Sequence, residues 1–157
     1  MTLLRTLMLL ALIVWIGGII FFAFVLAPTL FTVLSNTQLA GNVVSPALTK
    51  LHWMGLISGA VFLLASVIYN WQKFLRLRLF TASHVFVVLM MALTAYSQFV
   101  ITPRLRFLRA GPLSMDTMAA HAEFDRLHAW STRCEGGVLL LGLAVVILTG
   151  RRMGNSN

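Results

Sequence analysis

Polar side chains recur at helical spacing in the last third of the chain. The set begins at His121, and its successive members are four, three, four and three residues apart. On a continuous helix this spacing puts all of them on one face. Two imidazoles and a carboxylate on such a face, at His121, Asp125 and His128, are suitable ligands for a transition-metal ion. A helix that passes from water into lipid can also carry a polar face with no ligand at all. The members are His121, Asp125, His128, Thr132 and Glu135.

Another histidine, His52, stands near the start of an earlier apolar stretch. If both stretches are helices of an antiparallel bundle, His52 and His128 lie at the same end and face each other. Two facing histidines on separate helices are what haem b requires, and they also suit a metal ion with Asp125 or Glu135 as a further ligand. The alternative is that each histidine hydrogen-bonds a neighbouring helix or a lipid head group.

Glu135 lies about four residues, or roughly 6 Å, inside the last apolar segment. An acid at that depth is a candidate functional residue. It can stay ionised by pairing with Arg104 or Arg133, or it can be neutral and transfer a proton. Ser131 shares a helix face with His128, but the sequence offers no third group or oxyanion site for a nucleophile. Since phosphate loops, nucleophile elbows and zinc-protease motifs are also absent, the sequence favours a protein that is not an enzyme.

Long stretches without Asp, Glu, Lys or Arg must position these residues. Such stretches number four, with 44 residues after Arg5, 22 after Lys50, 25 after Arg78 and 15 after Glu135. A bilayer core needs about 20 apolar residues in a helix, because buried peptide groups must satisfy one another. The first three stretches are long enough, and the fourth becomes so when Glu135 and the turn before it are included. A hydrophobic content of 59% agrees with a membrane protein.

The predicted fold is therefore an all-α, antiparallel four-helix bundle in the membrane, forming a single domain over residues 1–157. The single cysteine, Cys134, excludes an internal disulfide. Proline residues mark helix ends in this prediction, with Pro46 before the second helix and Pro103 after the third. The predicted helices span residues 3–34, 47–71, 79–102 and 128–149, with an extramembrane segment at 104–127.

The net charge of +8 comes from basic residues near the predicted helix ends. This distribution suits side chains that reach anionic lipid head groups, so lipid rather than nucleic acid is the expected partner. Counting positive charges on either side barely distinguishes the two orientations. The densely basic loop after the second helix, with Lys73, Arg76 and Arg78, favours a cytoplasmic N-terminus in an inner or plasma membrane.

Several short patterns together resemble a known family. They are Trp15-x-Gly17 with Pro28, His52 after Pro46, Pro103-Arg104, and His128-x-x-Ser131-x-x-Cys134-x-x-Gly137. The set is similar to small four-helix membrane proteins of a family of unknown function, the bacterial relatives of a human transmembrane protein associated with cisplatin resistance. The first helix also resembles the copper-resistance D proteins and the HemJ-type oxidases, which bind haem. The resemblance implies a four-helix membrane bundle with polar positions at His52, Arg104, His128 and Ser131. The chain departs from the first pattern at Glu135, where the family tends to have Asn, and lacks the HemJ-type histidine of the first helix.

Two functions follow as predictions. In the first, the protein binds haem b or a metal ion through His52 and His128. In the second, it is a non-catalytic subunit of a larger membrane complex or a homo-oligomer, held to its neighbours by small residues. The packing residues of this second prediction are Gly17, Gly18, Gly55 and Gly59.

Overall fold

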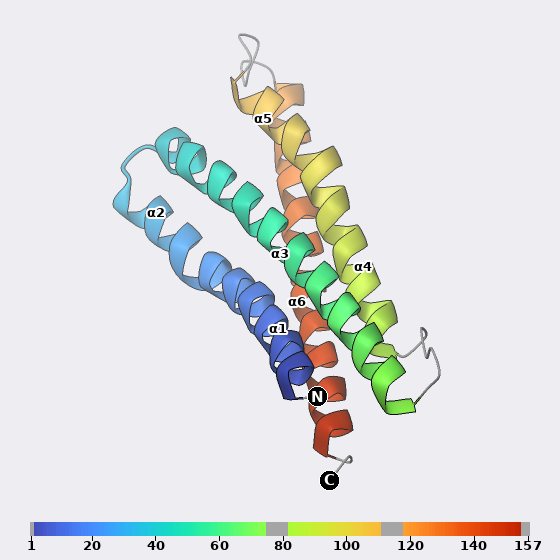
Figure 1. Ribbon diagram of the computed structural model, residues 1–157. Helices are drawn as coiled ribbons and strands as arrows, with labels where there is room; N and C mark the ends of the chain where they lie inside the picture. The colour runs from blue at the N-terminus through green and yellow to red at the C-terminus, as the bar shows by residue number, and fades with distance from the viewer. Residues whose placement is uncertain (1, 75–81, 111–117, 155–157) are drawn as a thin grey trace.

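The computed structural model describes residues 2–74, 82–110 and 118–154, and almost all of them are helical (Figure 1). Four long helical segments run alongside one another, and the start of the first and the end of the last lie at the same end of the bundle (Figure 1). The elements are α1 (Thr2–Phe21), η1 (Phe22–Leu26), α2 (Ala27–Val33), α3 (Thr37–Phe74), α4 (Ala82–Tyr96), η2 (Ser97–Ile101), α5 (Thr102–Ala110) and α6 (Met118–Gly154).

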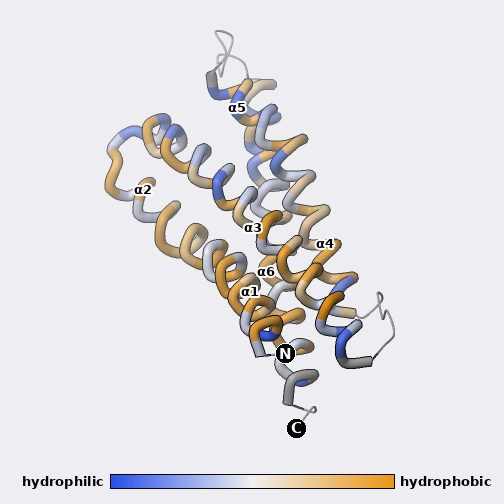
Figure 2. Tube along the Cα trace, viewed as in Figure 1, coloured by the Kyte–Doolittle hydropathy of each residue, from blue (hydrophilic) through white to orange (hydrophobic). Residues whose placement is uncertain are grey.

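Each of the four segments is long and apolar enough to cross a membrane. Hydrophobic residues occupy most of the length of the helices, while hydrophilic residues gather toward their ends (Figure 2). The predicted all-α, antiparallel four-helix bundle is confirmed, and the chain is a multi-pass membrane protein. The candidate spans are Thr2–Val33, Thr37–Gln72, Ala82–Arg109 and Met118–Arg151.

The helices continue further than the sequence indicates. Pro46, expected before the second helix, lies inside α3, and Pro103, expected to end the third, lies within α5. The last helix begins at Met118, ten residues before the predicted 128. The prediction followed the limits of the apolar segments, whereas a helix ends only where its backbone hydrogen bonds end. The predicted start at 79, and Arg76 and Arg78 of the basic loop, lie outside the described residues.

Two π-helical segments precede prolines at the same offset. The segment Phe22–Leu26 begins six residues before Pro28, and Ser97–Ile101 begins six residues before Pro103. A proline inside a helix has no N–H to donate, and its ring collides with the carbonyl four residues earlier. A wider π turn relieves this collision and keeps the helix continuous.

The first and third spans are also alike in sequence around these prolines. Residues 24–30 read FVLAPTL and residues 99–105 read FVITPRL. The following helix then carries Lys-Leu-His at 50–52 in the first half and Arg-Leu-His at 126–128 in the second. His52 thus corresponds to His128, at 24 and 25 residues after the respective prolines. The bundle consists of two similar helical hairpins.

The middle of the bundle is closed by an aromatic ring packed on glycines. Trp15 of α1 is almost completely buried, and a Cβ added at Gly55 or Gly59 of α3 would overlap its indole ring. A Cβ at Gly18 would come within 2.6 Å of the Met54 side chain. A Cβ added at Gly17, in contrast, would meet no atom of another part of the chain within 4 Å. Three of the four glycines predicted as packing residues therefore make contacts within this chain.

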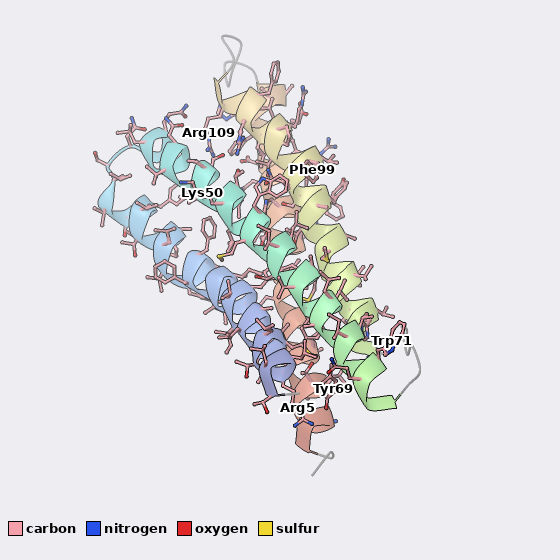
Figure 3. All side chains as sticks on the ribbon, viewed as in Figure 1. Arg5, Lys50, Tyr69, Trp71, Phe99 and Arg109 are labelled. Carbon is pink, nitrogen blue, oxygen red and sulfur yellow. The ribbon has the colours of Figure 1, made fainter. Side chains whose placement is uncertain are left out.

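At the end that carries the chain termini, a polar contact joins the first two spans. Arg5 Nη2 of α1 donates a hydrogen bond of 2.7 Å to the hydroxyl oxygen of Tyr69 on α3 (Figure 3). The guanidinium carbon also lies 5.4 Å from the centre of the Tyr69 ring. This contact fixes the ends of α1 and α3 where tyrosine and arginine are favoured at a membrane interface.

The glycine packing predicts the cost of adding one methyl group. In Gly55→Ala the new Cβ overlaps the Trp15 indole, and we expect a loss of about 1–3 kcal/mol in the free energy of unfolding. Thermal unfolding in a neutral detergent, followed by circular dichroism, measures it. Gly17→Ala is the matched control, because its Cβ meets nothing and alanine favours helix. Equal unfolding temperatures for the two variants would contradict the packing described.

Candidate functional site

A buried histidine joins three of the four spans. The side chain of His52 on α3 is only 1% exposed, and both of its ring nitrogens have partners. Nδ1 lies 2.8 Å from Oε1 of Gln98 in η2, and Nε2 lies 2.6 Å from Oε1 of Glu135 on α6. Since an amide oxygen only accepts, Nδ1 carries a hydrogen and donates it to Gln98.

The tautomer of His52 limits the proton between His52 and Glu135 to two positions. With hydrogen on Nδ1, a neutral imidazole has a bare Nε2, which can only accept a hydrogen bond from a protonated Glu135. A charged imidazolium instead donates from Nε2 to the ionised carboxylate. Both arrangements satisfy the same 2.6 Å contact, and they differ only in the position of one proton. The geometry is therefore that of a pair that can hold and transfer a proton.

The π turn η2 supplies the third member of this site. It presents Ser97 and Gln98 toward the interior, where both are buried. The hydroxyl of Thr102 donates a hydrogen bond of 2.9 Å to the Ser97 carbonyl oxygen, which satisfies a backbone acceptor within the π-helical stretch. The hydroxyl oxygens of Ser97 and Ser131 lie 3.4 Å apart, so α6 is linked to η2 directly as well as through His52.

Glu135 also reaches a cavity. Its side chain is 17% exposed, and it lines a hollow of about 280 Å³. One wall of this hollow is apolar and comes from the first span and α3. The other wall is more polar and comes from α5 and α6. The lining residues are Ile19, Phe22, Ala23, Ala27, Phe31, Val44, Ser45, Leu48, Thr102, Leu105, Arg109, His128, Ser131, Thr132 and Glu135.

The predicted metal ligands of α6 do not gather into a cluster. His121 and Asp125 are exposed on the surface of the helix. His128 is exposed as well, and its ring lines the cavity and stacks on Phe124 with centroids 6.2 Å apart. Within residues 2–74, 82–110 and 118–154, no three His, Cys, Asp or Glu side chains come close enough to hold a metal ion.

A bis-histidine haem fits this arrangement poorly. An iron ligand needs one ring nitrogen with a free lone pair. On His52 both nitrogens are already engaged, by Gln98 and Glu135. Haem or metal binding at His52 would therefore require one of these hydrogen bonds to break.

The predicted arginine partners of Glu135 are corrected by the structure. Arg104 forms two hydrogen bonds with Glu123, of 2.7 and 3.0 Å. They lie near the end of the bundle opposite the chain termini, which we call the loop end (Figure 1). Arg133 lies over the Trp130 ring, 5.4 Å from its centre. Glu135 pairs instead with His52, whose side chain reaches it from α3 through the interior of the bundle. Spacing along one helix could not reveal a partner from another span.

Gln98 is the site residue that the sequence prediction missed. One signal was available, because Gln98 is the only amide side chain in the charge-free stretch of residues 79–103. An amide within a membrane span needs hydrogen-bond partners, so it points to a polar site. Its partner could not be named without knowing how the spans are packed.

Comparison with known proteins gives a family and no function. Residues 10–111 match the domain of unknown function DUF4149, a range that includes His52 and Gln98 and ends before Glu135. No curated protein and no solved structure matches the chain. The relationships to the cisplatin-resistance-associated protein and to the copper-resistance D and HemJ-type proteins stay predictions. The predicted membership of an uncharacterised family is confirmed: the chain belongs to the DUF4149 family.

Proposed function

We propose that this protein binds a small lipid-like molecule within the membrane and exchanges a proton with it through the His52–Glu135 pair. The observation that carries the proposal is the position of Glu135. One of its oxygens bonds the buried imidazole, while the side chain also forms part of the cavity wall. A proton held by the pair is therefore accessible from the cavity.

The surroundings of the pair favour a switch between its two proton positions. In a medium of low dielectric constant, separating charge onto His52 and Glu135 is costly unless other groups stabilise it. Gln98 provides such stabilisation, because its carbonyl oxygen accepts from the imidazole in either state. A molecule that approaches Glu135 from the cavity with a donor or a charge changes the balance between the neutral and the ionic pair.

The carboxyl group of Glu135 provides a direct readout. We expect infrared difference spectra of the purified protein, recorded between alkaline and acidic buffer, to show a carboxylic C=O band that Glu135→Gln removes. Glu123→Gln is the matched control, since Glu123 is on the same helix but pairs with Arg104 and is not part of the cavity wall. If Glu135→Gln removed no band from the difference spectrum, leaving only those of surface carboxyls such as Asp125, the proposed proton exchange would be refuted.

The coupling between the two side chains can be measured separately. In Glu135→Leu the buried imidazole loses one partner, and we expect a loss of about 3–5 kcal/mol in the free energy of unfolding. The double variant His52→Leu/Glu135→Leu removes both polar groups and should cost less than the two single variants combined. Chemical unfolding in detergent gives all three values. Strictly additive costs would show that the pair does not interact.

The haem and metal proposal makes a competing prediction for the same residues. Haem b held by His52 and His128 would give a Soret band that is lost in His52→Ala and in His128→Ala, and a metal ion would appear in elemental analysis. Absorption spectra of oxidised and reduced protein, after expression with added haem precursor, test this. With both nitrogens of His52 hydrogen-bonded, we expect no such band; a band lost in both variants would displace proton exchange as the role of His52.

A further inference from the structure

A second hollow adjoins the cavity at the loop end of the bundle. It measures about 400 Å³ and shares Ser45 and Arg109 with the first. Five of its six lining residues carry polar or basic side chains, and they come from the start of α3 and from α5. Its lining residues are Gln38, Asn42, Ser45, Pro46, Arg106 and Arg109.

The two arginines of this second hollow have neutral partners only. Arg109 reaches across from α5 to α3, where its Nη1 donates a hydrogen bond of 2.7 Å to the carbonyl oxygen of Gly41 (Figure 3). Arg106 donates to the hydroxyl groups of Ser45 and Thr49. Neither guanidinium forms an ion pair with a carboxylate of the described residues. Each has five N–H donors, so donors and positive charge are left for a ligand.

The apolar wall of the first cavity and the basic side chains of the second hollow together suit an amphiphilic ligand. The first offers Phe22, Phe31 and Leu48 to a hydrocarbon chain. Its volume of about 280 Å³ is near the lower limit for small-molecule sites, which suits one chain better than two. The second hollow presents two guanidinium groups beside the amides of Gln38 and Asn42. Because a phosphate offers more charge and more acceptor oxygens than a carboxylate, it matches this set better.

We propose that the two hollows together bind a single-chain lipid with a phosphate head group. The head lies between Arg106 and Arg109, and the chain enters the apolar cavity beside Glu135. This lipid is the ligand of the cavity in the proposed function. Its binding rests on that use of the cavity but does not require Glu135 to exchange a proton. His128, which lines the cavity together with Arg109 and Glu135, offers a ring nitrogen to the same ligand.

Binding of an oleoyl glycerol phosphate to the protein in a neutral maltoside detergent tests the assignment. We expect the double variant Arg106→Gln/Arg109→Gln to weaken binding by about a hundredfold, roughly tenfold for each charge-assisted hydrogen bond lost. Arg133→Gln is the matched control, because Arg133 lies on the surface of α6 outside both hollows, and it should bind normally. An equal loss in Arg133→Gln would show a general charge effect and overturn the site.

Other ligands separate the contributions of head and chain. Oleoyl glycerol lacks the phosphate and oleate replaces it with a carboxylate, so both should bind more weakly; binding of either at full strength would overturn the phosphate assignment. Glycerol phosphate and inorganic phosphate lack the chain and should compete only at much higher concentration. Competition by either at the concentration of the lipid would mean a plain phosphate site and would also overturn the assignment.

A variant on the apolar wall tests the chain site alone. Ala23→Phe fills the cavity from the first span without altering either arginine, and it should weaken binding of the lipid while the unfolding temperature is kept. Unchanged binding by a folded Ala23→Phe protein would place the chain elsewhere and overturn the assignment. Lipid binding without a titrating Glu135 carboxyl would remove only the proposed proton exchange, and a titrating carboxyl without lipid binding would remove only this assignment.

Discussion

The hydrogen bonding of one buried imidazole constrains the whole loop end of the bundle. Within a membrane, a polar group that lacks partners costs several kilocalories per mole, so both nitrogens of His52 must be satisfied by protein. Glu135 and Gln98 do this from two different spans. The positions of α6 and of the π turn η2 relative to α3 follow from that requirement. Since the three side chains satisfy one another, changing one alters the environment of the other two.

The two similar hairpins use corresponding positions differently. By the alignment of the prolines and histidines, Gln98 corresponds to Ala23 and Glu135 corresponds to Gly59. His52 therefore meets an amide and an acid. At the positions that would supply the corresponding partners to His128, the chain has alanine and glycine. His128 and Ala23 both line the cavity. His52 therefore has polar partners from the other half, whereas His128 faces the cavity, although the two histidines stand in similar sequence patterns.

The sequence predicted the class of fold because the bilayer imposes it: long charge-free stretches must be helices, and short connections make them antiparallel. It also identified His52 and Glu135, since ionisable groups within apolar segments are rare and noticeable. It could not pair them. His52 was assigned to His128 by their positions along the spans, and Glu135 to an arginine by charge. The actual pairing depends on how the spans pack around the interior of the bundle, which hydropathy does not encode.

Tight packing and open space are separated along the bundle. In the middle, Trp15 fills the space left by Gly55 and Gly59, so α1 and α3 touch closely. Gly55 is one turn from His52 on α3, and Ile19, which lines the cavity, is one turn from Trp15. The closed glycine layer therefore lies directly beneath both the polar site and the cavity. Further along, the cavity lies between the first span, with the wide turn Phe22–Leu26 and α2, and α5 and α6. The glycine layer thus closes the middle of the bundle, and the cavity beside Glu135 lies on the same side of that layer as the second hollow and its arginines.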